Sequence, residues 1–526
     1  MALATLYLVG LIAAAYIVRL FFTKGHGASS HHNIPGPWTF SISSWRLAYE
    51  DFRGRRTRTI CQLHAKYGPV VRIGPDEVSF KSPTALRTIY GAGSGFQRTN
   101  YYGMFDAYGR PNLFSFASGK DHGDRKKLVA HAYSKTVMLR GSIAAMVESK
   151  AKQFLELIQT EPEGVSEIFR TLHYYSIDNI TGFLYGDSGA TSALTGNESH
   201  RALLSDMLDP ARRRLSWFAV HLPSFTKWLY SRSGRVEAIL KPVLPMQKPA
   251  MMTGIRQHAL AAFYRFKESS QKKKSSEVRG PTIIDRLYTH HQTQKPNGLD
   301  DLDIASECAD HLLAGIDTTS DTLMFLIWAL SLPQNHGFQA KLIQEVTDLP
   351  GSSLNGDGIP FVEAGDKLPY LNAVIREALR LYTPLPATEP RSLLTPSLID
   401  SFEIPAGMVV GVEPYSLHRN PNVFKDPLKF NPERWLNVPL ERLNEMNRWW
   451  WAFSSGGRMC IGIHLAMSEM TALVAAIYRR YQTSIAPGFE NVSPGITSRF
   501  EMFYDELFDK IEEHECRIKF APLGQM

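Results

Sequence analysis

The chain has 526 residues, of which 44% are hydrophobic and 21% are charged, so it can bury a large core. Its net charge of +7 is not accompanied by a nucleic-acid recognition motif, so we expect a membrane surface or an acidic protein as partner, and no nucleic acid. The four cysteines show no CxxC spacing, which excludes a zinc ribbon and a disulfide-rich secreted scaffold and favours a reducing compartment.

The first 23 residues predict a transmembrane signal anchor. Ala2 to Phe22 is apolar except for Arg19, and roughly 20 such residues span a bilayer as a helix. The segment has no positive region before its apolar run, so an anchor is favoured over a cleaved signal peptide. Because Arg19 and Lys24 lie at the downstream end of the run, the positive-inside rule places the rest of the chain in the cytosol.

Residues 24–45 predict a linker with a proline-rich hinge. The hinge, Ile34-Pro35-Gly36-Pro37, is stiff and extended because proline restricts both itself and the residue before it. We expect it to hold the remaining body, residues 46–526, at a fixed angle to the membrane.

The body predicts a mostly α fold with small β-sheets. Residues 70–74 and 77–80 predict two short strands around a Gly-Pro turn. The pattern is mostly helical from about residue 121 to residue 382, and it returns to short strands and turns over 384–414. Residues 417–437 are rich in turns, and residues 463–481 predict a further helix.

A long helical pattern over residues 301–332 contains the string Ala314-Gly315-Ile316-Asp317-Thr318-Thr319. Gly315 would let a flat ligand approach the helix, and Thr318 can hydrogen-bond to an intrahelical carbonyl or a ligand and so loosen the helix. Asp317 can relay protons, which oxygen activation requires. Taken alone, the string is unremarkable and favours an ordinary helix start at Asp or Thr.

The segment from Phe453 to Gly462, FSSGGRMCIG, predicts that Cys460 binds haem iron as a thiolate. Glycines such as Gly456 let a tight loop turn where a Cβ would clash, and an aromatic shield and backbone N–H donors keep a thiolate ionised and unoxidised. Arg458 can pair with a haem propionate. A thiolate ligand favours O–O cleavage. A lone cysteine is usually structural, but five fixed positions in ten residues argue against chance.

Together with three further motifs in the same order, this loop resembles the cytochrome P450 superfamily over nearly all of the chain after the N-terminal segment, in particular the fungal microsomal haem-thiolate monooxygenases. The resemblance implies a P450 fold and haem b with Cys460 as its axial ligand. It also implies that Thr318 is the oxygen-activating alcohol and Asp317 the acid. Because both are present, monooxygenation is favoured over the isomerase and dehydratase branches.

The resemblance assigns a structural triad and a set of cations around the haem. Glu377 and Arg380, from the Glu-x-x-Arg motif, would pair with Arg434 in the later segment Phe-Asn-Pro-Glu-Arg-Trp. Arg458 and Arg391 would bind the haem propionates. A third cation is expected on an early helix, where the chain departs from the family's Trp-x-x-x-Arg pattern. The residues concerned are His122, which can still donate to a propionate, and Arg125 and Lys126, either of which can point at the haem.

The resemblance also implies that electrons come from an NADPH-dependent flavoprotein reductase in the same membrane. Its acidic face would meet a basic surface that includes Arg125, Lys126, Lys425 and Arg448. We therefore expect a single-pass protein of the endoplasmic reticulum membrane with its catalytic domain facing the cytosol.

Substrate contacts are expected in residues 96–116, 203–249, 383–388 and 498–503 and in the helix before Thr318. Aromatic side chains of the first segment could line an apolar pocket or pack in the core, namely Tyr101, Tyr102, Phe105, Phe114 and Phe116. The expected reaction inserts one oxygen atom from O2 into an apolar small molecule, a fungal secondary-metabolite intermediate such as a terpenoid, polyketide or alkaloid. A haem-thiolate isomerase or dehydratase, which needs no reductase, and a non-catalytic haem sensor are the alternatives.

Overall fold

The computed structural model describes most of the predicted body, namely residues 33–205, 217–218, 220–222, 253–272, 282–293, 298–499 and 501–524. The predicted anchor, the first part of the linker and most of the predicted substrate segment 203–249 lie outside these residues. Among the residues that the structure describes, no helix combines the length and the apolarity needed to cross a membrane.

Helices make up most of the described chain. Those of the first half are α2 (Trp38–Ile42), α3 (Trp45–Phe52), α4 (Arg56–Tyr67), α5 (Pro83–Tyr90), α6 (Gly119–Val129), α7 (Lys135–Met138), α8 (Gly141–Gln159), α9 (Ile168–Tyr185) and α10 (Glu198–Arg201). Those of the second half are α14 (Thr253–Lys272), α15 (Ile283–Thr293), α16 (Asp301–Ser331), α17 (His336–Thr347), α18 (Val362–Asp366), α19 (Pro369–Leu381), α20 (Pro414–His418), α21 (Leu440–Trp449) and α22 (Ile463–Arg480).

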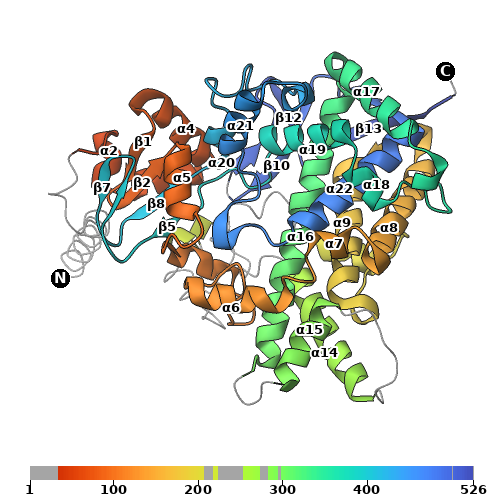
Figure 1. Cartoon of the computed structure of the whole chain (residues 1–526), viewed down its shortest axis with the longest axis horizontal. Coiled ribbons are helices and arrows are strands. Elements are labelled where there is room, and N and C mark those ends of the chain that lie inside the picture. Colours follow the sequence, from red (N-terminus) through yellow and green to blue (C-terminus); the bar gives the residue numbers. More distant parts are fainter. Residues whose placement is uncertain are drawn as a thin grey trace, which may run out of the picture.

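The strands form small sheets. The largest has the order β1-β2-β8-β5-β3, from β1 (Val70–Gly74), β2 (Glu77–Phe80), β8 (Val409–Val412), β5 (Arg391–Ser392) and β3 (Gln97–Arg98). Two three-stranded sheets have the orders β4-β13-β9 and β11-β10-β12, from β4 (Val165–Glu167), β13 (Arg517–Pro522), β9 (Tyr481–Ile485), β11 (Glu501–Phe503), β10 (Val492–Ser498) and β12 (Lys510–Glu513). A hairpin pairs β6 (Ser397–Ile399) with β7 (Phe402–Ile404). Figure 1 shows the five-stranded sheet with α2, α4 and α5 at one end of the molecule and the large helices at the other.

The hinge packs onto the five-stranded sheet. The backbone N–H of Arg72 in β1 donates to the carbonyl of Pro35 at 2.8 Å, and Ile34 is buried in the core on which this sheet packs. A Cβ added to Gly36 would lie 2.6 Å from the carbonyl oxygen of Arg72. Only glycine allows the hinge to approach β1 so closely, and this contact fixes where the chain enters the body.

The central element is α16, which runs through the helical part of the molecule (Figure 1). It begins with a capping box in which Asp300 and Asp303 each accept from the other's backbone N–H. Its second half is buried on all sides, as expected for a helix with an apolar surface all round, and it packs against α9, α19 and α22. This rigid helix supports the candidate site.

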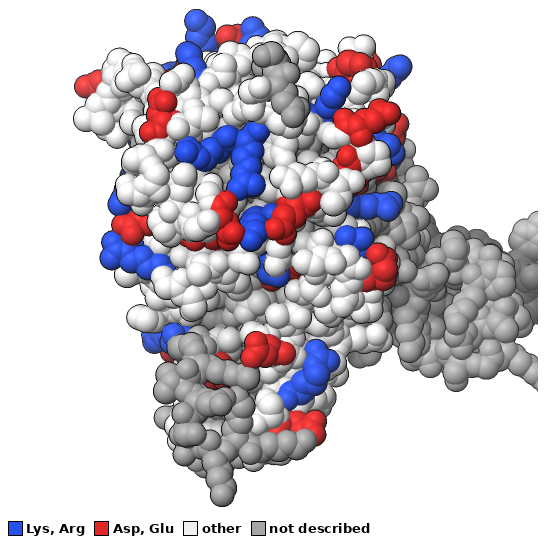
Figure 2. All heavy atoms as spheres, turned by 90° about the vertical axis from the view of Figure 1, so that its right-hand side faces the viewer, with Lys and Arg blue, Asp and Glu red and all other residues white. Residues whose placement is uncertain are grey.

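Most sequence predictions of element type agree with the structure, but the predicted linker 24–45 contains α2 and the first residue of α3. The two strands at 70–74 and 77–80 and the helices predicted over 301–332 and 463–481 are confirmed to within one residue. The strands β9 to β13 after residue 480 were not predicted. On the face formed by α8, α17 and α18, Figure 2 shows Lys and Arg side chains mixed with Asp and Glu side chains, so this face carries no extended basic patch.

Candidate functional site

Cys460 lies at the end of a tight loop between α21 and α22. Its backbone N–H donates to the carbonyl of Phe453 at 2.9 Å, which closes the loop around the short 3₁₀ helix η9 (Gly456–Arg458). Gly456 has a φ of +64°, and a Cβ there would lie 2.2 Å from the carbonyl oxygen of Tyr90. The glycine is therefore required because the end of α5 presses against the loop.

The Cys460 thiol has the surroundings that a thiolate ligand needs. The backbone N–H groups of Gly462 and Ile463 donate to Sγ. Burial among protein atoms raises the pKa of this thiol, while these two donors and Lys126 lower it. The side chain is nevertheless exposed, so the sulfur is open to a ligand. Binding a metal cation would offset the cost of burying the thiolate charge.

Several cations converge on the same region. Desolvation, followed by the charges of Arg458, Arg98, Lys126 and Arg391, lowers the pKa of His122 to about 3. Desolvation and the neighbouring Arg98 and Arg391 likewise lower the pKa of Arg458 to about 9. Such a cluster of like charges is relieved by an anionic group, and it fits the two propionates of haem.

Of these cations, the sequence named Lys126 as a candidate beside the haem and did not name Arg98. Lys126 lies in α6, and its Nζ donates to the carbonyls of Gly457 and Met459 in the cysteine loop at 3.1 and 2.9 Å. Arg98 in β3 was not predicted. It is buried, its Nη1 donates to the carbonyl of Leu113, and its Nε has no partner. A lone arginine in a two-residue strand carries no sequence signal for this role.

Arg125 does not join the cation cluster. Its Nη1 donates to Glu307 Oε2 at 2.7 Å, and its guanidinium lies over the ring of Phe116. Of the two candidates on α6, the geometry therefore favours Lys126 as the residue beside the haem loop. The prediction that Arg125 contributes to a reductase-docking surface is wrong because its side chain is buried, whereas Lys425 and Arg448 are exposed.

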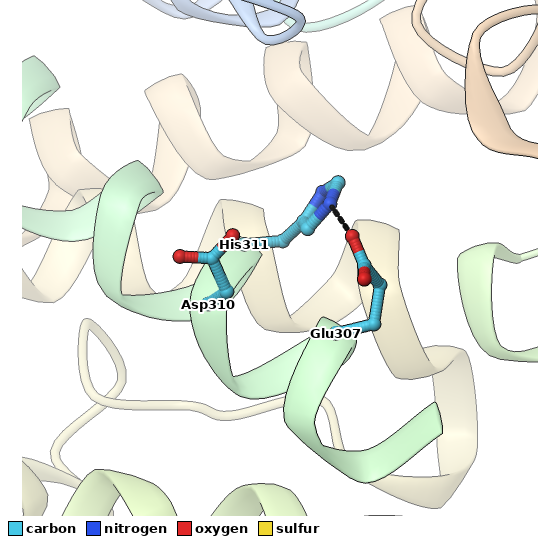
Figure 3. A group of neighbouring side chains, drawn as sticks. All are labelled: Glu307, Asp310 and His311. Carbon is cyan, nitrogen blue, oxygen red and sulfur yellow. Dashed lines mark hydrogen bonds and ion pairs between the residues drawn. The ribbon is translucent and has the colours of Figure 1, made fainter. Parts of the chain in front are cut away.

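Glu307, Asp310 and His311 of α16 lie close enough to hold a metal ion (Figure 3). However, Glu307 is occupied by Arg125 and by His311 Nε2 at 3.0 Å, and His311 Nδ1 is bonded to the hydroxyl of Tyr133. The carboxylate of Asp310 points away from this pair and accepts from the backbone N–H of Phe114. We therefore interpret the cluster as a closed network that fixes α6 and the preceding loop to α16.

The stretch of α16 around Thr318 differs from the prediction in one respect. A Cβ added to Gly315 would lie 2.7 Å from Ile180 Cγ1 in α9, so the glycine is required for helix packing and not for the approach of a ligand. The neighbouring Ala314 is exposed, and Asp317 and Thr318 are half-buried. The hydroxyl of Thr318 donates to the carbonyl of Ala314 at 2.7 Å, and α16 continues through this point without a break.

The predicted triad is assembled around Glu377, whose side chain is fully buried. Arg380 donates to both carboxylate oxygens at 2.9 and 2.8 Å, and Arg434 Nε donates to Oε1 at 3.0 Å. The backbone N–H of Asn431 and the indole of Trp435 complete the set of donors. The charge of Glu377 is thus balanced and fully hydrogen-bonded.

His418, which the sequence did not single out, connects this triad to the cysteine loop. Its Nδ1 donates to the carbonyl of Arg380 at 3.0 Å, and its Nε2 accepts from the backbone N–H of Trp451 at 2.8 Å. Desolvation, together with Arg380 and Arg419, lowers the pKa of His418 to about 3. The ring is therefore neutral and has a fixed tautomer.

The aromatic residues of the segment 96–116 pack mainly against one another. Edge-to-face contacts join Tyr102 to Phe114 and Phe105 to Phe114, with ring centroids 5.4 and 4.9 Å apart. Tyr102 is almost fully buried and accepts from Arg391 Nη1 at 2.6 Å, so it positions a cation of the site. For Tyr102 the structure supports core packing, while Tyr101, Phe105, Phe114 and Phe116 are partly exposed.

Known proteins share this sequence pattern. The family model described as Cytochrome P450 matches residues 35–495. The cytochrome P450 monooxygenase aflV of Aspergillus parasiticus is 31% identical over 85% of this chain and 84% of its own length. The cytochrome P450 monooxygenase stcB of Emericella nidulans is 30% identical over 85% of this chain and 81% of its own length. The cytochrome P450 monooxygenase FGM1 of Gibberella zeae is 26% identical over 91% of this chain and 92% of its own length. The chain therefore belongs to the cytochrome P450 family, and it is an oxidoreductase of the monooxygenase type that its relatives' names describe.

Proposed function

We propose that the protein inserts one atom of O2 into an apolar small molecule, with electrons supplied by an NADPH-dependent flavoprotein reductase. The observation that carries this proposal is the Cys460 thiol, which receives two backbone N–H donors at the start of α22. Family membership implies haem with a thiolate ligand, and the two donors, the exposed sulfur and the cation cluster fit such a group. Bound there, haem would supply the dioxygen chemistry that amino-acid side chains cannot provide.

The chain's own residues would hold the cofactor and deliver protons. Arg458, Lys126, Arg391 and Arg98 would neutralise the propionates, and the neutral ring of His122 would donate a hydrogen bond to one of them. Gly462 would orient the sulfur through its N–H group. On α16, the hydroxyl of Thr318 would accept a proton from Asp317 and pass it on to the reacting oxygen, while its bond to the carbonyl of Ala314 keeps it oriented. The exposed Ala314 leaves room beside this hydroxyl.

We place the protein in the endoplasmic reticulum membrane, with its body in the cytosol. The support is the apolar segment of residues 2–22 and the positive residues that follow it. The exposed Lys425 and Arg448 would contribute to the docking surface for the reductase. The matched relatives come from filamentous fungi, which supports a fungal secondary-metabolite intermediate as the substrate.

The first test is the absorption spectrum of the reduced, carbon-monoxide-bound protein. A strongly red-shifted Soret band is expected, and Cys460→Ser should abolish it. A wild-type band at the position of histidine-ligated haem would refute thiolate ligation by Cys460.

The second test is turnover of a panel of terpenoids, polyketides and alkaloids with and without reductase and NADPH. Oxygenated products that require both would support the proposal. Turnover without reductase would instead identify an isomerase or dehydratase, the alternative against which the Asp317–Thr318 pair argues. Ligand binding without any turnover would identify a haem sensor.

A further inference from the structure

Asp317 is in contact with a buried histidine from a neighbouring helix. Nε2 of His173 in α9 lies 3.4 Å from Oδ1 of Asp317, and the side chain of His173 is only 2% exposed. Nδ1 of the same ring lies 2.6 Å from the carbonyl oxygen of Phe169. Both nitrogens of the ring therefore face oxygen atoms.

These contacts fix the number of protons in the pair. A backbone carbonyl can only accept, so Nδ1 of His173 carries a proton that is donated to Phe169. The contact between Nε2 and the Asp317 carboxyl is attractive only if a further proton lies between them. That proton is either on His173, as an imidazolium facing a carboxylate, or on Asp317, as a carboxylic acid facing a neutral ring.

The surrounding charges favour the imidazolium. Burial alone lowers the pKa of His173, but the hydrogen bond to Asp317 and the charges of Asp321 and Asp317 outweigh it, and the pKa lies above its ordinary value. Asp321 follows one helical turn after Asp317, and burial raises the pKa of its carboxyl well above the usual range. These two carboxyl groups of α16 are the titratable groups that act on the ring of His173, and the ring of His514 stacks on Phe169.

We propose that His173 is the positioning and proton-holding residue for Asp317. In the step that it serves, the Nε2–H bond of the imidazolium breaks and an O–H bond forms on Asp317 Oδ1. The ring is left neutral with its proton on Nδ1, and a proton taken up from solvent later restores the imidazolium. This inference rests on the proposed function because it gives Asp317 the role of the acid beside Thr318.

His64 provides a matched control within the same chain. It is also buried, and its Nδ1 lies 2.9 Å from a backbone carbonyl, that of Gly68. However, its Nε2 faces the hydroxyl of Ser79 and no carboxylate, and burial lowers its pKa to about 4. The two histidines thus differ chiefly in the partner of Nε2.

The direct test is an NMR titration of the full-length holoenzyme in its diamagnetic, reduced, carbon-monoxide-bound form, with 13C-labelled histidine. His173→Gln and His64→Gln assign the two signals. We expect the His173 signal to titrate above pH 6.5, the His64 signal to stay neutral down to about pH 4, and Asp317→Asn to lower the pKa of His173. A His173 ring that is neutral at pH 6.5, or that does not respond to Asp317→Asn, would overturn the proposal.

The second readout is coupling, the fraction of NADPH electrons that appears in product and not in peroxide. His173→Gln should increase the share of electrons lost as peroxide several-fold at pH 7, and this share should no longer depend on pH. His64→Gln should change neither the peroxide share nor its pH dependence. Wild-type coupling in His173→Gln at every pH would refute the proton-holding role. If the wild-type protein lacks the thiolate band or oxygenates nothing, the proposed function fails, and the wild-type titration still decides whether His173 and Asp317 share a proton.

Discussion

Replacing Glu377 with glutamine should weaken the whole haem-proximal core. The variant keeps the shape of the side chain but removes its charge and turns one acceptor oxygen into an amide donor. Oε1 of Glu377 accepts from Arg380, Asn431 and Arg434, and Oε2 accepts from Arg380 and the indole of Trp435. Whichever oxygen is replaced, at least two buried donors lose their acceptor.

The magnitude follows from these contacts. A buried donor left without a partner costs about 1–3 kcal/mol, and breaking a buried ion pair costs about 3–5 kcal/mol. Both figures describe the same loss, so we expect the free energy of unfolding to fall by about 4 kcal/mol. A body of about 500 residues has an unfolding entropy near 1 kcal/mol per kelvin, so the midpoint temperature of thermal unfolding should fall by about 4 °C.

The assay is the loss of the reduced carbon-monoxide band on heating, recorded at one scan rate because unfolding of a cofactor-containing protein is not expected to be reversible. Glu433→Gln is the matched control. Glu433 is one residue from Arg434 in sequence, but its partner is the exposed Lys341, and an exposed pair contributes about 0–1 kcal/mol. Equal midpoints for the two variants would refute the argument that the Glu377 network holds this region.

Three further outcomes are expected. Thr318→Ala should keep the haem spectrum and divert electrons to peroxide, measured as peroxide formed per NADPH; unchanged coupling would show that this hydroxyl does not relay protons. Gly456→Ala should lower haem content severely, because its methyl group would overlap the carbonyl of Tyr90, whereas Gly457→Ala, where a Cβ meets nothing, should not. Below pH 6.5 the unfolded chain binds a proton at His418 that the folded chain excludes down to about pH 3. The free energy of unfolding should therefore fall by about 1.4 kcal/mol per pH unit as the pH is lowered through this range. In thermal scans, His418→Gln should reduce this dependence of the unfolding midpoint on pH.

The sequence predicted the parts of the site that depend on neighbouring residues. The Cys460 loop was recognisable because its glycines, arginine and cysteine lie within ten residues, and the triad because Glu377 and Arg380 occupy one face of a helix. The helix α16 was recognisable from its length and apolar pattern. In each case the chemistry requires particular residue types at short fixed spacings, and a single sequence displays such spacings directly.

The remaining features depend on contacts between distant segments. Gly315 is a glycine because Ile180 of α9 lies against it, and Arg125 turns away from the haem loop because Glu307 is a closer partner. Arg98 and His173 are single residues in unremarkable local sequences, and the roles proposed for them depend on the packing of β3 and α9. No spacing along the chain could indicate these partners.

The position of the thiolate is thus set from two sides. Gly456 rests on the end of α5, while Trp451 at the start of the loop is bonded to His418, which in turn is bonded to Arg380 of the triad. Because neither contact involves the haem, the loop is held by the protein before a cofactor adds its own bond. Loss of the triad should therefore displace Cys460 as well as lower stability. The Glu377→Gln protein should bind haem with a weakened thiolate band even at temperatures where it remains folded.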